Sequence, residues 1–339
     1  MSREPKLVVA VTGPTGTFGF GLAPLLEADS RIAGVVGIAR RPFDPSAQGW
    51  SKMAYRQGDV RDPAALEAAF TGADVVVHLA FLVASTASRD VTHAVNVDGT
   101  VNAVRAAAAA GARRFVYASS VAAYGFHADN PVGITEDWPT RPAAHLGYAQ
   151  DKAELEQVLL AEADAHPDLD LYLLRPPVVL GPHAVGGKDL LTGLLPSLVG
   201  RAASAVRRLP LPLPAPVPAL PFQLIHEDDV GQALLLCIVG AGPPGAYNIA
   251  ADGVATGADL ARELGFTPLP VPNGLARGAA QAVAGLPFMP VPVTWAEALT
   301  HPAIMDTSKA RRELGWSPRH TALDTLRAGL AAAAPDRAT

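Results

Sequence analysis

Tyr148 and Lys152 are the residues of this chain whose types and spacing could do chemistry. They stand at the head of a predicted helix, and residues four apart on a helix share one face. A free tyrosine has a pKa of about 10, but a fixed positive charge nearby favours the phenolate and lowers the pKa of the phenol. The pair therefore predicts a proton relay at a carbonyl or carbinol oxygen. Taken alone, the same spacing also fits a solvated helix face.

A glycine-rich turn near the N-terminus could hold a dinucleotide. The apolar run Leu7–Val11 predicts a short buried strand, and the turn after it leads into an apolar helix start. Gly13 allows the tight turn, Gly16 lets the backbone approach a pyrophosphate, and Gly19 permits close packing of helix on strand. The helix N-terminus would face the phosphates. A flexible loop is the alternative, but its position after a buried strand favours a dinucleotide site, which would also include Thr15, Thr17 and Phe18.

Short apolar runs alternate with helical runs through the first half of the chain. Such alternation predicts an α/β fold with a doubly wound parallel sheet of the Rossmann type. Ligands on such sheets bind at the carboxyl ends of the strands. We expect further strands over Val35–Ala39, Val75–Leu79, Phe115–Ala118 and Leu171–Leu174, and helices over Ala64–Phe70, Val95–Ala110 and Tyr148–Ala165.

The regular alternation ends after Gly181, which predicts a second, smaller lobe. Prolines at alternate positions from Pro210 to Pro221 favour an extended connector without a hydrogen-bonded ladder, or a segment that docks a partner. Strands over Phe222–Ile225 and Ala246–Ile249 are expected to return to the nucleotide domain. Helices are expected over Asp259–Leu264 and Thr321–Ala333.

These features predict two domains. A dinucleotide-binding domain would take up residues 1–180, with returning segments at about 222–250. A smaller C-terminal substrate-binding lobe would take up residues 181–221 and 251–339.

The motifs, taken in order, resemble the extended short-chain dehydrogenase/reductase family, which includes NAD-dependent epimerases and dehydratases. Each piece is modest, but the ordered set is specific and runs nearly end to end. Besides the glycine turn and Tyr148 with Lys152, the matching motifs are Gly58-Asp59-Val60, His78-Leu79-Ala80, Asn96-Val97-Asp98-Gly99-Thr100, Phe115–Ser120, Leu174-Arg175-Pro176, Ile225–Val230 and Leu314-Gly315-Trp316.

The resemblance implies a catalytic set of Ser120, Tyr148, Lys152 and Asn96. The Ser120 hydroxyl would hold the substrate oxygen in place for Tyr148, although the neighbouring Ser119 could be confused with it. Lys152 would lower the pKa of the phenol and hydrogen-bond the nicotinamide ribose. Asn96 would support Lys152 through backbone and water contacts.

The resemblance also implies where a cofactor binds. Asp59 and Val60 would bracket the adenine ring, and Leu79 and Ala80 would run beneath the adenosine and ribose. Pro176, in the motif after the sixth predicted strand, would belong to the same site.

Arg40 and Arg41 follow the second predicted strand, where NAD-preferring members carry an acidic residue that binds the ribose hydroxyls. A guanidinium suits a 2′-phosphate by charge and by bidentate geometry. We therefore expect NADP as the cofactor, with NAD as the alternative, although one of these arginines could simply be solvated on a loop.

Three functions remain open. The first is an NAD(P)-dependent oxidoreductase that acts on a small-molecule ketone or secondary alcohol, with Tyr148 as proton donor or acceptor. The second is an NAD-dependent nucleotide-sugar epimerase. The stretch Leu220–Gln223 lacks the basic residue that meets the diphosphate in sugar-nucleotide members, but Arg201, Arg207 and Arg208 lie upstream and could substitute for it. Val121–Ala123 stands where a dehydratase carries an acid–base couple. The third, a nucleotide-sensing regulator, would not need the intact triad.

Composition and charge argue against other classes. A formal net charge of −5 disfavours a nucleic-acid surface, and no apolar run is long enough for a membrane span. The nine histidines show no ligand spacing, so no metal site is expected, and His78 is expected to be a satisfied core histidine. The single cysteine, Cys237, cannot form an internal disulfide. With a short polar N-terminus these features predict a cytoplasmic protein, and the resemblance allows a homodimer.

Overall fold

The computed structural model describes residues 6–83, 88–144, 146–184, 213–218, 220–272, 274 and 301–333. Its centre is a seven-stranded sheet whose neighbouring strands are all parallel. The strand order is β11-β6-β5-β4-β1-β2-β3, so the order reverses between β1 and β4. The strands are β1 (Leu7–Thr12), β2 (Ile32–Ala39), β3 (Met53–Gln57), β4 (Val75–His78), β5 (Arg114–Ala118), β6 (Asp170–Arg175) and β11 (Gly245–Asn248).

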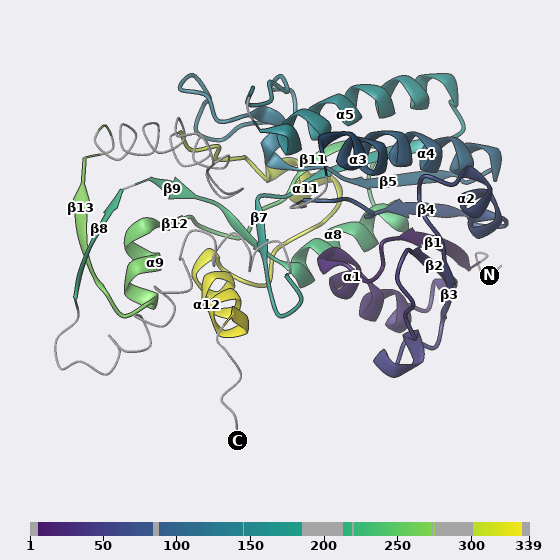
Figure 1. Ribbon diagram of the computed structural model, residues 1–339, viewed down its shortest axis with the longest axis horizontal. Coiled ribbons are helices and arrows are strands. Elements are labelled where there is room, and N and C mark those ends of the chain that lie inside the picture. Colours follow the sequence, from purple (N-terminus) through teal and green to yellow (C-terminus); the bar gives the residue numbers. More distant parts are fainter. Residues whose placement is uncertain are drawn as a thin grey trace.

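Helices cover both faces of this sheet (Figure 1). Alternate strand residues are buried on opposite faces, as Val9 and Val11 are on one side and Ala10 is on the other. This burial on both faces explains the continuous apolar runs in the sequence, and the predicted doubly wound α/β fold is confirmed. One face carries α1 (Thr17–Ala28) and α8 (Glu227–Ile238), and the other carries α2 (Pro63–Phe70), α4 (Gly99–Ala109) and α5 (Gly147–Ala165).

The helix expected over Val95–Ala110 starts earlier and contains an irregular turn. It begins as α3 (Arg89–His93), passes through the π-helical turn η2 (Ala94–Asp98) and continues as α4. Asn96 lies inside that turn, and such turns are frequent at functional sites because they re-aim side chains. Two short 3-10 helices, η1 (Pro45–Gln48) and η3 (Val121–Tyr124), complete the first half.

The strand prediction for Phe222–Ile225 is wrong in its pairing. The segment divides into β9 (Pro221–Phe222) and β10 (Leu224–His226), and neither joins the seven-stranded sheet. β10 pairs with β7 (Val178–Leu180), and β9 pairs with β12 (Ala255–Thr256). The chain returns to the main sheet only through α8 and β11, because the apolar helix must first cross beneath the sheet.

The proline-rich stretch also differs from prediction, since part of it does form a ladder. β8 (Pro214–Pro218) pairs in parallel with β13 (Thr267–Val271), and each proline lies opposite a residue of another type. Because alternate residues of a strand direct their backbone groups to the same side, prolines at alternate positions remove donors from one edge only. The other edge remains able to pair.

The described part of the C-terminal region adds α9 (Gly257–Glu263), α11 (Ser308–Glu313) and α12 (Ala322–Ala333). In the figure, α9 and α12 lie with β8, β9, β12 and β13 at the opposite end of the molecule from β1 and β2 (Figure 1). Within the residues that the structure describes, no helix combines the length and apolar character needed to cross a membrane. Arg201, Arg207 and Arg208, the upstream arginines that could meet a diphosphate, lie outside the described residues.

The contact between α1 and α8 gives a first prediction, because it depends on the absence of side chains. A Cβ at Gly21 would lie 2.2 Å from the carbonyl oxygen of Glu227. A backbone oxygen cannot move away cheaply, so we expect Gly21→Ala to lower the free energy of unfolding by about 1–3 kcal/mol. Alanine normally stabilises a helix relative to glycine, so this loss of stability would be opposite to the difference in helix propensity. Chemical denaturation measures the effect.

Gly34→Ala in β2 is the matched control. Its Cβ would meet no atom closer than 3.9 Å, so its denaturation midpoint is expected to stay close to that of the unaltered protein. Equal midpoints for the two variants would contradict this account of the helix contact.

Candidate active site

The first turns of α5 place Tyr148 and Lys152 beside the segment that follows β4. The rings of Phe81 and Tyr148 meet edge to face with 5.6 Å between centroids. The ammonium nitrogen of Lys152 lies 3.6 Å from the centroid of the Phe81 ring. Phe81 follows Ala80, whose backbone is so close to Gly13 that a Cβ there would lie 2.9 Å from the Ala80 Cα. The tyrosine and lysine therefore share one end of the sheet with the glycine turn.

The two neighbouring serines after β5 have different partners. Ser120 accepts a hydrogen bond from the backbone N–H of Ala122 at 3.1 Å, and its hydroxyl hydrogen-bonds the phenol of Tyr148. Ser119 instead donates to the buried Glu156 carboxylate at 2.5 Å. The serine that faces the tyrosine is Ser120.

Lys152 is buried, and its ammonium bonds to two groups of β5. The ammonium donates to the Tyr117 hydroxyl at 3.1 Å and to the carbonyl oxygen of Ala118 at 2.7 Å. Burial lowers the pKa of Lys152 to about 7, against the opposing attraction of Glu156 and Asp151. Near neutral pH, Lys152 would therefore exist partly as the ammonium and partly as the neutral amine.

The expected lowering of the Tyr148 pKa by Lys152 is not found. Burial raises the pKa of the Tyr148 phenol above its usual value, and the opposing influence is the hydrogen bond with Ser120. The Lys152 nitrogen lies 5.8 Å from the centroid of the Tyr148 ring, and its hydrogen bonds are made to β5. Desolvation of the phenolate outweighs the distant and partly deprotonated ammonium.

Asn96 fixes the backbone of the segment after β4. Its side-chain oxygen accepts from the N–H of Leu82 at 2.8 Å, and its amide nitrogen donates to the carbonyl oxygen of Leu82 at 3.2 Å. The same nitrogen donates to Asp151 at 3.1 Å. The side-chain contacts of Asn96 are thus to the Phe81–Leu82 segment and to Asp151.

His78 connects the two turns beneath the site. Its Nδ1 lies 2.8 Å from the Thr12 hydroxyl, and its Nε2 lies 3.0 Å from the Thr100 hydroxyl. Thr100 donates to the carbonyl oxygen of Asn96, so Nε2 must carry the proton that Thr100 accepts. Burial, assisted by the charge of Lys152, lowers the pKa of His78 to about 3. His78 is the satisfied core histidine that the sequence predicts.

Thr12 completes this connection by accepting hydrogen bonds from the backbone N–H groups of Leu79 and Ala80, both at 3.2 Å. At the end of β6, the carbonyl oxygen of Pro176 accepts from the N–H of Val121, next to Ser120. The predicted cofactor residues Leu79, Ala80 and Pro176 therefore lie just past the carboxyl ends of β4 and β6, at one edge of the sheet.

The glycine turn leaves room for phosphate at one position. Gly13 has φ +67° and is closely packed, and a Cβ on Gly19 would lie 2.2 Å from the carbonyl oxygen of Pro14. Gly16 has an ordinary φ of −93°, and its Cβ would meet nothing closer than 3.5 Å. Gly16 is also the N-cap of α1 and offers no side-chain oxygen to the first turn. The turn that carries Thr15, Thr17 and Phe18 therefore fits a pyrophosphate at the helix N-terminus.

The adenine end of the predicted site is only partly available. Asp59 is held by Arg61 through bonds of 3.1 and 2.7 Å, which lower the pKa of the carboxyl. Val60 is buried against α4, close to Gly99. Arg40 is exposed after β2, as is its neighbour Arg41. Among the described residues, no ion pair or side-chain hydrogen bond engages either guanidinium.

Sequence reasoning missed several polar pairs near the site, among them one ion pair and one hydrogen-bonded pair with a histidine. Arg175 binds the buried Glu156 carboxylate at 2.9 and 2.5 Å, on the helix that carries Lys152. His183, after β7, lies 2.7 Å from the buried Glu227 carboxylate, and its carbonyl oxygen accepts from the Thr17 hydroxyl at 3.2 Å. Both pairs join residues distant in sequence, so no local pattern could reveal them.

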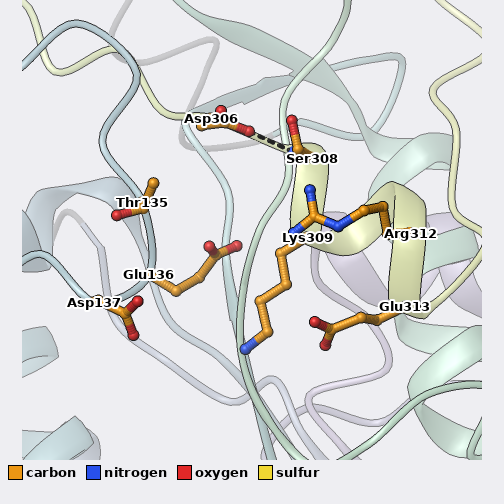
Figure 2. A pocket seen from close by; sticks show the side chains of 8 residues that line it. All are labelled: Thr135, Glu136, Asp137, Asp306, Ser308, Lys309, Arg312 and Glu313. Carbon is orange, nitrogen blue, oxygen red and sulfur yellow. Dashed lines mark hydrogen bonds between the residues drawn. The ribbon is translucent and has the colours of Figure 1, made fainter.

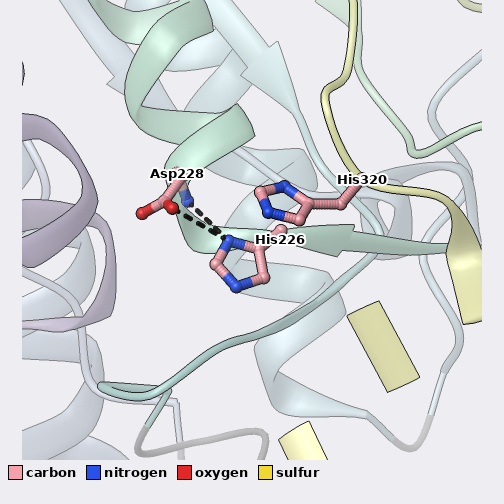
Figure 3. Close-up of side chains that lie close together, drawn as sticks. All are labelled: His226, Asp228 and His320. Carbon is pink, nitrogen blue, oxygen red and sulfur yellow. Dashed lines mark hydrogen bonds and ion pairs between the residues drawn. The ribbon is translucent and has the colours of Figure 1, made fainter. Parts of the chain in front are cut away.

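Two further clusters adjoin these pairs. One lines a cavity of about 300 Å³, with Glu136, whose carbonyl oxygen accepts from Arg175, among its residues. Figure 2 shows how its acidic side chains lie between the 135–137 segment and α11, together with Lys309 and Arg312. Figure 3 shows His226, Asp228 and His320 close together. The two imidazoles stack with centroids 4.0 Å apart, and each Nδ1 is engaged, by the N–H of Asp228 and by Asp229 respectively. Nearly parallel rings do not direct their nitrogen lone pairs to a common point between them.

Comparison with known proteins places these features in a family. Residues 9–250 match the family model of the NAD dependent epimerase/dehydratase family. The uncharacterized protein y4nG of Sinorhizobium fredii is 29% identical over 326 residues, which cover 92% of this chain and 74% of that protein. The uncharacterized protein Rv0501 of Mycobacterium tuberculosis is 28% identical over 333 residues, which cover 96% of this chain and 83% of that protein.

Solved structures share the fold over nearly the whole chain. WbmG of Bordetella bronchiseptica, in complex with NAD, superposes with a TM-score of 0.72 at 21% identity, covering 98% of this chain and 95% of WbmG. The UDP-glucose 4-epimerase of Thermotoga maritima, with UDP-glucose, gives a TM-score of 0.69 at 19% identity, covering 96% and 98%.

The geometry of the glycine turn predicts that two substitutions in it will have separate effects. Gly16→Ala is expected to fold with an almost unchanged melting temperature but to bind NAD(H) or NADP(H) at least about tenfold more weakly, because the added methyl occupies space open only for a ligand. Gly19→Ala is expected to lower the melting temperature, because its methyl meets the Pro14 backbone. Thermal denaturation and cofactor titration by calorimetry measure both. Unimpaired binding by a folded Gly16→Ala protein would contradict the assignment.

Proposed function

The chain belongs to the NAD-dependent epimerase/dehydratase family of extended short-chain dehydrogenases/reductases, and from this premise we propose that it moves a hydride between NADP(H) and a ketone or secondary-alcohol carbon while Tyr148 transfers the proton. One observation carries the proposal. Tyr148 and Lys152 both contact the ring of Phe81, which directly follows the backbone that Gly13 contacts, and Ser120 bears on the Tyr148 phenol. A proton relay and a phosphate-binding turn therefore adjoin the same short segment.

The proposed roles follow from the contacts. Ser120, already bonded to the phenol, would hold the substrate oxygen within reach of Tyr148. The raised pKa of Tyr148 keeps the phenol protonated, so it can donate to a carbonyl oxygen. Lys152, with a pKa of about 7, can pass a proton on near neutral pH. The nicotinamide, when bound, supplies or accepts the hydride.

The cofactor is proposed to be NADP, although NAD is the cofactor in the complexes of WbmG. Support comes from Arg40 and Arg41, which are exposed after β2 and carry no ion pair to the described residues. Asp44, the nearest acidic residue along the chain, is held by Ser46, and Asp59 is already bound by Arg61, so neither offers much to a ribose. Two exposed guanidinium groups favour a 2′-phosphate.

The substrate is proposed to lack a diphosphate. Gln223, at the segment where sugar-nucleotide members usually carry a basic residue, is buried and exchanges two hydrogen bonds with the backbone of Met305. Its place is therefore structural. We further propose that residues 181–221 and 251–339 form the substrate-binding lobe, because the described strands there pair among themselves.

Nucleotide-sugar epimerisation is the second candidate. It is favoured by the likeness to the Thermotoga maritima UDP-glucose 4-epimerase, solved with UDP-glucose, and to WbmG, also solved with NAD and UDP. Dehydration is weaker, because the residues after Ser120 are the apolar and buried Val121, Ala122 and Ala123. Incubation with carbonyl compounds and with nucleotide sugars separates the two: the first function consumes the cofactor stoichiometrically, whereas the second leaves its redox state unchanged.

Loss of one hydroxyl tests the proposed proton transfer. Tyr148→Phe is expected to reduce kcat by a factor of about 100 to 10 000, because it removes the acid that protonates the substrate oxygen. Cofactor affinity is expected to change less than threefold. Tyr172→Phe is the matched control, since its hydroxyl bonds the carbonyl oxygen of Gly242 and none of the predicted site residues. Near-normal turnover by Tyr148→Phe would remove the assigned role.

Cofactor preference is tested by charge removal on either side of β2. The double substitution Arg40→Ala with Arg41→Ala is expected to weaken NADP binding by about tenfold or more and to leave NAD binding nearly unchanged. Arg31→Ala, at the other end of the same strand, removes an exposed guanidinium that pairs with Asp29 and is the control. Dissociation constants for both cofactors decide the matter, and tighter binding of NAD by the unaltered protein would overturn the preference.

A further inference from the structure

A fully buried carboxylate lies next to the proposed relay without belonging to it. Asp151 precedes Lys152 on α5 and is 0% exposed. One of its oxygens lies 2.5 Å from a guanidinium nitrogen of Arg89 on α3, a side chain that is 47% exposed. The other accepts the amide of Asn96 at 3.1 Å. An isolated buried carboxylate would cost much free energy, so this one is retained with both oxygens engaged.

Through Asn96, the contacts of Asp151 extend to the segment that follows β4, next to Lys152. Asn96, which donates to Asp151, also binds both backbone groups of Leu82. Leu82 follows Phe81, whose ring lies against the Lys152 ammonium. A continuous series of bonds therefore runs from Arg89 through Asp151 and Asn96 to the segment that covers the lysine.

The electrostatic position of Asp151 is as specific as its contacts. Burial disfavours the ammonium form of Lys152, and the two influences that oppose it are Glu156 and Asp151. His78 is neutral at physiological pH, and Tyr117 and Tyr148 are phenols whose pKa values burial raises. The groups that face the ammonium are thus Tyr148, Asp151 and Glu156 on α5, Tyr117 on β5 and His78 on β4.

Glu156 is already neutralised by a buried partner, whereas Asp151 is not. Arg175 binds both carboxylate oxygens of Glu156 and is itself only 6% exposed. The pair is therefore shielded from water, and its two opposite charges largely cancel at a distance. Arg89 reaches Asp151 from the solvent side, where water weakens its field. Of the two carboxylates, Glu156 has the larger effect on the ammonium, but Asp151 is the one whose counter-ion is exposed.

We propose that Asp151, held in place by Arg89, is a positioning residue that keeps Lys152 protonated. Through its hydrogen bond with Asn96, it also fixes the backbone of Leu82, next to the Phe81 ring that contacts Lys152. The inference rests on the proposed role of Lys152 in proton transfer. A merely structural carboxylate at the start of α5 would stabilise the helix but would leave the titration of Lys152 unaltered.

The test is a direct titration of the lysine, independent of any substrate. The chain has five lysines, Lys6, Lys52, Lys152, Lys188 and Lys309, so 13Cε-lysine labelling gives few signals in an NMR spectrum. The Lys152 signal is assigned as the one missing from Lys152→Arg. In the unaltered protein it is expected to titrate near pH 7. In Asp151→Asn, which keeps an acceptor for Asn96 but removes the charge, the midpoint is expected to move to lower pH.

Asp164→Asn is the matched control, because it removes an equal charge from an exposed side chain near the other end of the same helix. It is expected to leave the Lys152 midpoint unmoved. An unmoved midpoint in Asp151→Asn, or an equal movement in Asp164→Asn, would overturn the proposal. If Asp151→Asn does not fold, Asp151→Ser makes the same charge change with a smaller side chain and is read in the same way.

A kinetic measurement links the titration to the reaction. With any substrate that the protein turns over, the pH at which kcat falls on the acid or alkaline side is expected to move in Asp151→Asn in the direction of the NMR midpoint. Failure to find a substrate would count against the proposed function but leave the titration result intact. A moved midpoint with an unmoved pH profile would remove Asp151 from the reaction.

Discussion

The close approach of two turns, one after β1 and one after β4, is the constraint on which the rest of this structure depends. Gly13 must lack a side chain because the Ala80 backbone occupies that space, and Thr12 binds the N–H groups of Leu79 and Ala80. Through this contact the glycine turn and the Phe81 ring become parts of one surface. Without it, a phosphate site and a proton relay would exist on the same chain but would not serve one substrate.

The second requirement is that charged side chains of α5 are buried, which by itself lowers the stability of the folded protein. Lys152 and Glu156 follow Tyr148 at intervals of one helical turn, so one face of the helix carries a half-buried phenol, a buried ammonium and a buried carboxylate. Hydrogen bonds to β5 offset the desolvation of Lys152, and the ion pair with Arg175 of β6 offsets that of Glu156. The site is consequently stable only as a set, since the loss of one partner leaves another charge unpaired.

Much of the fold could be predicted from sequence because strands buried on both faces leave continuous apolar runs. β3 left no such signal, since it is an edge strand whose Arg56 and Gln57 are exposed. The Tyr148–Lys152 spacing was visible because helix geometry brings residues four apart together. The contacts of Lys152 with Tyr117 and Phe81 were not, because they join residues separated by many positions, and the raised pKa of Tyr148 follows from burial that sequence spacing does not report.

The protonation states together indicate a direction in which the chain alone is prepared to act. The Tyr148 phenol keeps its proton because burial opposes the phenolate, and the Ser120 hydroxyl beside it only partly offsets that effect. Lys152 can lose or regain a proton near neutral pH, which suits a group that resupplies the phenol. In the proposed function, these residues would donate a proton to a carbonyl oxygen, whereas proton removal from an alcohol would require a further positive charge near the phenol. The charge of Lys152, on which Glu156 and Asp151 act, would then decide how readily the phenol regains its proton.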